Sequence, residues 1–235
     1  EAIGTNGLLV RVGAYFHDIG KMLKPVYFAE NQGQEESRHE SLVPAMSTLV
    51  IVAHVKDGAD LARQHRLPKS FIDFIEQHHG TTLVEYFFDQ AKGKRKEDPE
   101  SSEVDESTFR YPGPKPQSKE TAIAMMADSI ESATRVLQEP TPARVRDLVE
   151  EIVEGKRRDG QLDEAPLTLR EITVLKNTFV KVLSGIHHHR IYYPATKHLT
   201  DVGMESGGEE PTSDTESEAT STSGQFELDD ATGRD

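Results

Sequence analysis

Apolar residues recur every three or four positions along most of the chain as far as His187, a spacing that buries one face of an α-helix. No segment shows the strict alternation of apolar and polar residues that marks a half-buried β-strand. The sequence therefore predicts an all-α fold rather than one built on a β-sheet. The strongest helical segments are Leu42–Val55, Phe71–His79, Ser118–Leu137, Ala143–Lys156 and Thr168–His187.

Short polar and glycine signals place the ends of these helices. Ser118 and the Thr141-Pro142 pair are typical of the position before a first helical turn, because a hydroxyl there can accept a hydrogen bond from a free backbone N–H. Gly80 stands where a helix can end in the left-handed conformation. We expect Asp57-Gly58 to form a turn that precedes a short helix over Ala59–His65.

Two segments are predicted to interrupt the helices. Residues 92–107, which follow a helix expected over Leu83–Ala91, are densely charged and contain Pro99, so we interpret them as a mobile insertion. The run Tyr111–Pro116 holds three prolines, which lack a backbone donor and fix φ. It is therefore predicted to be a proline-rich loop.

The charge of the chain is concentrated at its C-terminal end. The sequence has 41 acidic and 27 basic residues and a formal net charge of −14. Residues 200–235 hold eleven acidic residues and one basic residue, so this segment alone carries −10. With few apolar side chains to offset its ordering entropy, it is predicted to be a disordered acidic tail that follows a domain over residues 1–199. The overall acidity argues against DNA or RNA as a partner, since phosphate binding needs clustered Lys and Arg.

Cysteine is absent from the sequence, which excludes disulfides, thiolate metal ligands and thiol catalysis. No stretch approaches the roughly 18 consecutive apolar residues of a membrane span, so the polypeptide as given is expected to be soluble. The chain begins with Glu1 and lacks the features of a signal peptide, and Leu8, Leu9 and Val12 already follow a helical pattern. We therefore expect the chain to start inside a helix and to be a piece of a longer protein.

Histidine and aspartate occur at several positions that the pattern places within apolar helices or at their ends. Each position alone has a simpler explanation, such as a hydrogen-bonded core histidine, a histidine pair that caps helix carbonyls, or a structural aspartate. Together they indicate one metal centre, because unpaired charges among apolar residues are costly and because imidazole and carboxylate suit divalent metals. The residues are His17, Asp18, His54, His78, His79 and Asp128.

The same residues resemble a known family. The run His17-Asp18-Ile19-Gly20-Lys21, followed by His54, His78-His79 and Asp128, is similar to the HD superfamily of metal-dependent phosphohydrolases in its two-metal form. The segment Tyr111-Pro112-Gly113-Pro114-Lys115-Pro116 narrows the resemblance to the cytoplasmic domain of the seven-transmembrane HD phosphodiesterases, which hydrolyse cyclic di-AMP in bacteria. The similarity covers roughly residues 1–195 and leaves out the acidic tail. It implies an HD-domain helical bundle.

The resemblance implies two iron or manganese ions and a ligand set for each. His17 and Asp128 would hold one ion, and Asp18 would bridge to the other. The second ion would be held by His54, His78 and His79. In the family a further histidine, on the helix before the HD pair, completes the first set, and no histidine precedes His17 in this chain. The missing histidine is consistent with a chain that is a piece of a longer protein. It also leaves open a second function, that of a non-catalytic signalling module that binds nucleotide or metal.

The reaction that the resemblance implies is hydrolysis of a phosphodiester. A water activated by two metals would attack phosphorus in line, the 3′ oxygen would leave, and cyclic di-AMP would become the linear dinucleotide pApA. Lys21, one helical turn from the HD pair, is expected to place its ammonium against a phosphate oxygen and to act with Asp18 in catalysis. Arg110, Tyr111 and Lys115 are expected to border the substrate.

The resemblance also implies a cellular setting: second-messenger signalling on the cytoplasmic face of the bacterial cell membrane, with an upstream transmembrane region as the anchor and a homodimer as one option. An HD phosphohydrolase of another nucleotide is an alternative within the same class. A structural interaction domain, with the acidic tail as its active part, is an alternative from a different class. Measuring the metal content of the chain separates these functions. Two ions per chain would indicate the enzyme, one ion the binding module, and no ion the structural domain.

Overall fold

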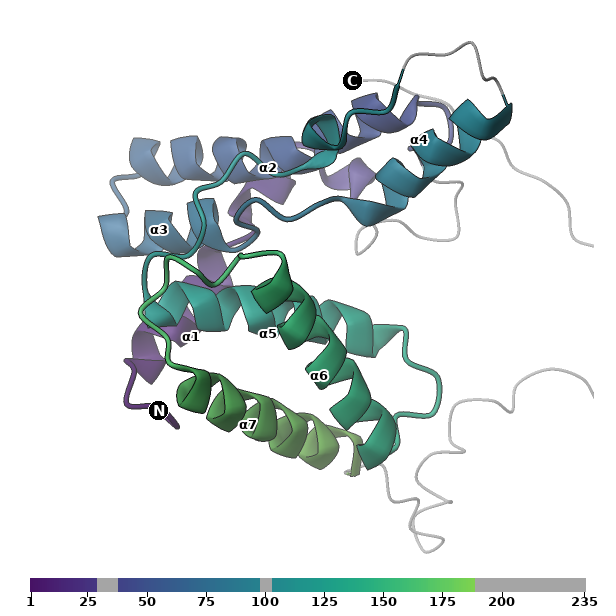
Figure 1. Ribbon diagram of the computed structural model, residues 1–235. Coiled ribbons are helices and arrows are strands. Elements are labelled where there is room, and N and C mark those ends of the chain that lie inside the picture. The colour runs from purple at the N-terminus through teal and green to yellow at the C-terminus, as the bar shows by residue number, and fades with distance from the viewer. Residues whose placement is uncertain (29–37, 98–102, 189–235) are drawn as a thin grey trace, which may run out of the picture. The chain divides into compact units, whose positions relative to one another are not determined.

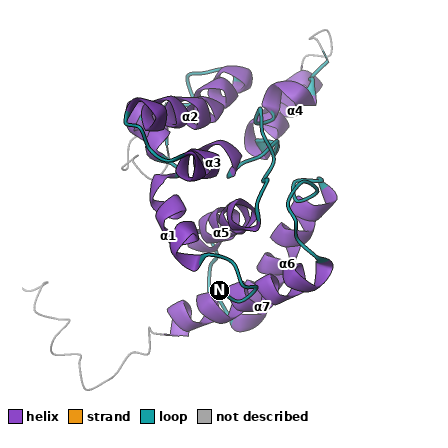
Figure 2. Cartoon of the chain, turned by 90° about the vertical axis from the view of Figure 1, so that its left-hand side faces the viewer, coloured by secondary structure: helices purple, strands orange, loops and turns teal. Residues whose placement is uncertain are grey.

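A computed structural model describes residues 1–28, 38–97 and 103–188 of the chain. Within these ranges the chain forms seven α-helices and several short 3₁₀ helices, and Figure 2 shows no strand among them. An isolated β-bridge pairs Leu83 with Arg110. The predicted all-α fold is confirmed.

Figure 1 traces the order of the helices along the chain by colour. Among the described helices, none combines the length and the apolar composition that a membrane span requires. The α-helices are α1 (Gly7–Phe16), α2 (Pro44–Gln64), α3 (Lys69–Gln77), α4 (Glu85–Glu97), α5 (Lys119–Arg135), α6 (Pro142–Arg158) and α7 (Leu169–His188). The 3₁₀ helices are η1 (Ile19–Leu23), η2 (Pro25–Tyr27) and η4 (Glu106–Phe109).

The largest buried cluster joins α5, α6 and α7, which lie together in the lower part of Figure 1. On α6, Val145, Val149 and Val153 follow one another at every fourth position, and all three are fully buried in this cluster. Full burial of a side chain of this size contributes about 1.5–3 kcal/mol. The packing holds α5 in place, and α5 carries Asp128.

A second, smaller cluster packs α3 on α2. Ala59 and Ala62 of α2 meet the fully buried Ile75 of α3, and the small alanine side chains let the two helices approach closely. Helix α1 packs against both α3 and α5, so it joins this cluster to the larger one. As a result, the C-terminal end of α1, the middle of α2 and the end of α3 come together.

Three of the predicted helix ends are confirmed. Ser118 accepts a hydrogen bond from the N–H of Thr121, and the Thr121 hydroxyl in turn accepts one from the N–H of Ser118, which completes a capping box at the start of α5. Thr141 caps α6 by accepting from the N–H of Arg144. Gly80, with φ of +53°, adopts the left-handed conformation just after α3.

The predicted turn at Asp57-Gly58 was wrong, since helix α2 continues through both residues. Gly58 serves close packing instead, because the backbone of Gly20 in η1 lies directly against it. A β-carbon added at Gly20 would overlap the carbonyl oxygen of His54. This approach of η1 to α2 places Asp18, two residues before Gly20, beside His54.

Other boundaries also differ from the predictions. Helix α1 begins at Gly7 with the side chain of Asn6 as its N-cap, so the expectation that the chain starts inside a helix was wrong. Helix α4 continues to Glu97 instead of ending at Ala91, because Lys, Arg and Glu are good helix formers despite their charge. Residues 98–102 of the predicted insertion, the predicted domain boundary at 199 and the predicted acidic tail lie outside the described residues.

Replacing Gly20 by alanine is expected to lower the free energy of unfolding by about 3 kcal/mol, because the added methyl group must push η1 away from α2. Gly93→Ala in α4 is the matched control, since nothing lies within 4 Å of its added β-carbon. Removing that helical glycine is expected to stabilise the chain by about 0.5–1 kcal/mol. Urea denaturation measures both changes, and a Gly20→Ala chain as stable as the wild type would contradict the close contact.

Candidate metal centre

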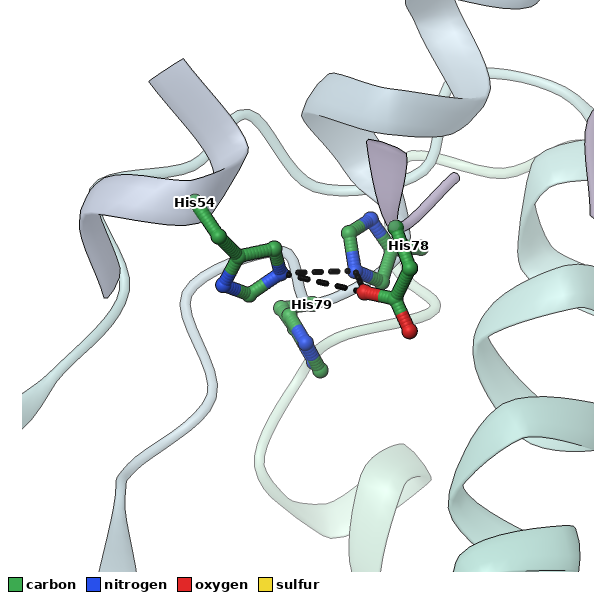
Figure 3. Close-up of side chains that lie close together, drawn as sticks. His54, His78 and His79 are labelled. Carbon is green, nitrogen blue, oxygen red and sulfur yellow. Dashed lines mark hydrogen bonds and ion pairs between the residues drawn. The ribbon is translucent and has the colours of Figure 1, made fainter. Parts of the chain in front are cut away.

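The side chains predicted to bind metal converge from separate helices. His17 is the C-cap of α1 and Asp18 is the N-cap of η1. His54 lies within α2, the two histidines His78 and His79 follow α3, and Asp128 lies on α5. Figure 3 shows the rings of His54, His78 and His79 turned toward one another. The structure therefore brings all six predicted ligands together.

A first group, called here the three-histidine group, comprises Asp18, His54, His78 and His79. Their ligand atoms all lie within 4.8 Å of one another. Nε2 of His54 is 3.2 Å from Nε2 of His78. Oδ1 of Asp18 lies 3.4 Å from the first of these nitrogens and 3.5 Å from the second. This spacing is small enough for one metal ion to contact every member.

A second group, called here the HD group, comprises His17, Asp18 and Asp128, and its ligand atoms also lie within 4.8 Å of one another. Nε2 of His17 is 3.2 Å from Oδ2 of Asp18 and 3.5 Å from Oδ1 of Asp128. Asp18 belongs to both groups and offers a different oxygen to each. The two groups thus form one continuous cluster that could hold a pair of metal ions.

Backbone carbonyls orient three of the imidazole rings. In each ring Nδ1 donates a hydrogen bond to a carbonyl about one helical turn earlier, which leaves Nε2 directed into the cluster. Metal-binding histidines usually have their second nitrogen fixed in this way, which selects the tautomer and the ring orientation. The bonds run from His17 to Ala14 O at 2.8 Å, from His54 to Ile51 O at 2.6 Å and from His78 to Ile75 O at 2.9 Å.

The polar atoms of the cluster fit a divalent cation. Nε2 of His17 and Oδ1 of Asp18 are buried and lack a hydrogen-bond partner among the described residues. With Nδ1 donating to the backbone, the Nε2 atoms of His54 and His78 present lone pairs to each other and to the Asp18 carboxylate. Together with Oδ1 of Asp18 these nitrogens form a set of acceptors that is unfavourable alone, and a cation would satisfy them. Imidazole and carboxylate ligands suit divalent metals such as iron and manganese.

The pKa values in the cluster follow from burial and from these contacts. Burial alone would lower the pKa of His17, but contacts with Asp128 and Asp18 outweigh it and raise that pKa to about 10. The pKa of His54 falls to about 4 because of burial and the nearby His78, and burial also lowers the pKa of His79. The HD group therefore attracts positive charge strongly, while His54 and His79 stay neutral at pH 7, as a metal ligand must be.

Lys21 lies beside the cluster, as the sequence predicted. Its Nζ is 2.8 Å from Oδ2 of Asp18 and lies over the ring of Phe28, 5.3 Å from the centroid. The lysine is part of η1 rather than of a continuous α-helix with His17, yet the i, i+3 spacing still brings it to Asp18. Its role toward a substrate stays a prediction.

The residues predicted to border the substrate lie in different surroundings. Tyr111 is buried and its ring stacks on that of His79, with centroids 4.2 Å apart. Arg110 donates to both carboxylate oxygens of Asp159, at 3.1 and 2.9 Å, and to the carbonyl of Thr81 at 2.8 Å. Lys115 packs near Gly80. Contact of Arg110, Tyr111 or Lys115 with a substrate stays a prediction.

Two glutamines that the sequence analysis missed hold the loops behind the histidines. Gln161 is fully buried, and its side-chain oxygen accepts a hydrogen bond from the N–H of Thr81 at 2.9 Å. Gln77, at the end of α3, accepts one from the N–H of Gln117 at 2.9 Å and so ties the proline-rich loop to α3. Nothing in the local sequence distinguishes these side chains from surface amides, because both act on residues far along the chain.

In this all-α fold a histidine-aspartate pair follows the first helix. Histidines and an aspartate from later helices lie next to that pair, and this combination defines a class of domain. The chain belongs to the HD-domain family, whose family model matches residues 1–133. The ligands that the resemblance named in the sequence from His17 to Asp128 lie within this matched range.

Among curated proteins the chain is similar to the cyclic-di-AMP phosphodiesterase PgpH of two bacteria. It is 47% identical to the protein of Bacillus subtilis strain 168 over 198 residues, which are 84% of this chain and 27% of that protein. It is 44% identical to the protein of Listeria monocytogenes over 197 residues, again 84% of this chain and 27% of that protein. The chain thus spans about a quarter of the length of these relatives.

Solved structures of the HD domain of L. monocytogenes PgpH share the fold. One crystal structure matches with a TM-score of 0.73 and 44% identity and covers 79% of this chain and 85% of that one. A second, in complex with cyclic-di-AMP, matches with a TM-score of 0.72 and 43% identity and covers 78% of this chain and 83% of that one.

Proposed function

We propose that the domain over residues 1–199 is a metal-dependent phosphodiesterase that hydrolyses cyclic di-AMP to the linear dinucleotide pApA. The observation that carries this proposal is that Asp18 belongs to two ligand groups at once, an arrangement suited to two neighbouring metal ions. The choice of substrate is supported by the relatives named cyclic-di-AMP phosphodiesterases and by the related HD domain solved with that dinucleotide.

The residues that would hold the ions follow from the two groups. The HD group would hold one divalent cation and the three-histidine group the other, with Asp18 between them. Iron and manganese suit this mixture of imidazole and carboxylate. When bound, such cations supply Lewis-acid chemistry, which makes water a better nucleophile at neutral pH and neutralises charge on a phosphoryl group.

Hydrolysis of the substrate forms a bond from the oxygen of water to phosphorus and breaks the bond from phosphorus to the 3′ oxygen. The leaving oxygen takes a proton, so pApA carries a 3′ hydroxyl and a 5′ phosphate at the new ends. Lys21 places a positive charge next to Oδ2 of Asp18, where a phosphate oxygen can approach the cluster. We assign it the role of a hydrogen-bond donor to that oxygen.

The loops around the three-histidine group keep its rings in position. Tyr111 stacks on His79 and closes one side of the group against water. Arg110 holds the carbonyl of Thr81, two residues after His79, while Asp159 accepts from the same guanidinium. We assign Tyr111 and Arg110 mainly to positioning His79, and Lys115 to the border of the substrate site.

The chain loaded with Mn²⁺ or Fe²⁺ is expected to convert cyclic di-AMP to pApA, and anion-exchange chromatography of the nucleotides measures the product. Removal of metal with EDTA should stop the reaction, and added Mn²⁺ should restore it, because the cluster has no other source of Lewis acidity. About two metal ions per chain are expected by elemental analysis, as the two groups require.

Other results of this activity assay would indicate other functions. Faster hydrolysis of another nucleotide than of cyclic di-AMP would contradict the substrate and leave the phosphohydrolase class in place. Tight binding of cyclic di-AMP by the metal-loaded chain without any product would indicate a signalling module instead. A chain that binds neither metal nor nucleotide would contradict both readings.

A further inference from the structure

A cavity of about 880 Å³ opens along α5, the helix that carries Asp128. It is lined by the start of α4 and by residues of α5 and α6. Thr82, three residues after His79, and Ser129, next to Asp128, both line it, whereas none of the six candidate ligands does. Its volume falls within the roughly 300–1,000 Å³ that is typical of small-molecule sites.

Lys156 of α6 brings a positive charge into this cavity. Its side chain is half-buried, and its Nζ donates a hydrogen bond to Oγ1 of Thr82 at 3.0 Å. An ammonium group has three N–H donors, so this bond to a neutral hydroxyl leaves capacity for an anionic acceptor. Lys156 is therefore suited to bind an anion that enters the cavity.

The two other cations in the cavity lining differ from Lys156, since the protein's carboxylates engage Arg110 and Arg158 is exposed to solvent. Arg110 forms a two-point ion pair with Asp159 and also contacts Glu106. Arg158 donates to the carbonyl of Glu154. A guanidinium held by two carboxylates has little charge to offer a ligand, so Lys156 is the better candidate for an anion.

Apolar side chains form another part of the lining, contributed by Leu83, Ala133, Leu148 and Ile152. A nucleobase can bury its flat faces on such side chains, while the nearby hydroxyls of Thr82 and Ser129 can hydrogen-bond to its polar groups or to a ribose. Glu85 and Glu151 also line the cavity, so the part of the lining that matches a nucleoside attached to a phosphate is the apolar surface together with the ammonium of Lys156.

We propose that Lys156 binds the second phosphate of the cyclic dinucleotide, the one that is not hydrolysed, while the nucleoside next to that phosphate packs in the cavity. This inference rests on the proposed function. A cyclic dinucleotide has two phosphates joined through its nucleosides, so a phosphate at the metal centre holds the other at a distance. The cavity along α5 supplies both the space and the charge for that second half.

The test compares two substrates on the metal-loaded chain. Lys156→Met removes the charge and keeps the aliphatic stem, and it is expected to raise KM for cyclic di-AMP by about 10–100-fold, the effect of one charge-assisted hydrogen bond. Bis(p-nitrophenyl) phosphate has one phosphodiester and no nucleoside, so its kcat/KM should change by less than about twofold. The Kd of the hydrolysis-resistant bis-phosphorothioate analogue of cyclic di-AMP should rise by the same factor as KM.

Two further variants control for structural effects. Lys156→Arg keeps a cation and should retain most of the affinity for the analogue. Arg146→Met removes an exposed cation from the same helix, outside the cavity lining, and should leave Kd unchanged. Metal content and thermal melting of all variants should match the wild type.

The outcomes separate this inference from the proposed function. A wild-type chain that binds the analogue, together with an unchanged Kd in Lys156→Met, would overturn the role of Lys156 alone. Equal loss of activity toward both substrates would also overturn it, since that pattern indicates a structural role. A wild-type chain that cleaves bis(p-nitrophenyl) phosphate but neither binds nor cleaves cyclic di-AMP would overturn the proposed substrate and this inference together.

Discussion

An Asp18→Ala chain is expected to lose both metal ions. Asp18 faces the three-histidine group with Oδ1 and the HD group with Oδ2, so its removal takes a ligand and a negative charge from each. Bound metal contributes several kcal/mol of charge stabilisation in such reactions, and each 1.36 kcal/mol corresponds to a tenfold change in rate. We therefore expect kcat/KM for cyclic di-AMP to fall by on the order of 10³-fold.

The contrast with His79→Ala makes this prediction specific. His79 belongs to the three-histidine group alone, so its removal is expected to reduce the metal content of one position and leave the other filled. His65→Ala, which removes an exposed imidazole at the end of α2, is the control and should keep both ions. Equal loss of metal from the Asp18→Ala and His79→Ala chains, measured by elemental analysis, would contradict the shared role of Asp18.

The grouping of the six candidate ligands could be predicted from the sequence because each of them is marked locally. His17-Asp18 and His78-His79 are adjacent pairs, and His54 and Asp128 interrupt apolar helical stretches where a charged group needs a partner. The helix caps Ser118 and Thr141 could be predicted equally well from the sequence, since a cap depends on residues only three positions away.

Features that depend on contacts between distant segments could not be predicted in this way. Asp57-Gly58 has the composition of a turn, yet the helix continues because Gly58 packs on the backbone of Gly20 from η1. Lys156 resembles any other lysine near the end of a helix until α5 and the start of α4 enclose it. Gln161 likewise acquires its role only through Thr81, which lies eighty positions earlier in the sequence.

The histidines of the metal-free chain predict how its stability depends on pH. His54 has a folded pKa of about 4 against 6.5 for the ordinary group, so the unfolded chain binds more protons between these values. Stability should therefore fall as the pH drops from 6.5 toward 4, by up to about 1.4 kcal/mol per pH unit for this residue. Burial lowers the pKa of His79 as well, which acts in the same direction.

His17 has the opposite effect, because Asp128 and Asp18 raise its folded pKa to about 10 despite its burial. Its contribution to the free energy of unfolding is fully present below pH 6.5 and is lost as the pH rises toward 10. The metal-free chain should therefore be most stable near pH 6.5, where neither histidine lowers its stability. Urea denaturation in EDTA between about pH 5 and 9 measures this maximum, because the number of protons bound by the histidines differs between the folded and unfolded states over that range.

His17→Gln should remove the decline in stability above the maximum, and His54→Gln should weaken the decline below it. A stability that keeps rising up to pH 9 in the wild-type chain would contradict the charge that the two carboxylates hold on His17, and with it the attraction of the HD group for a cation.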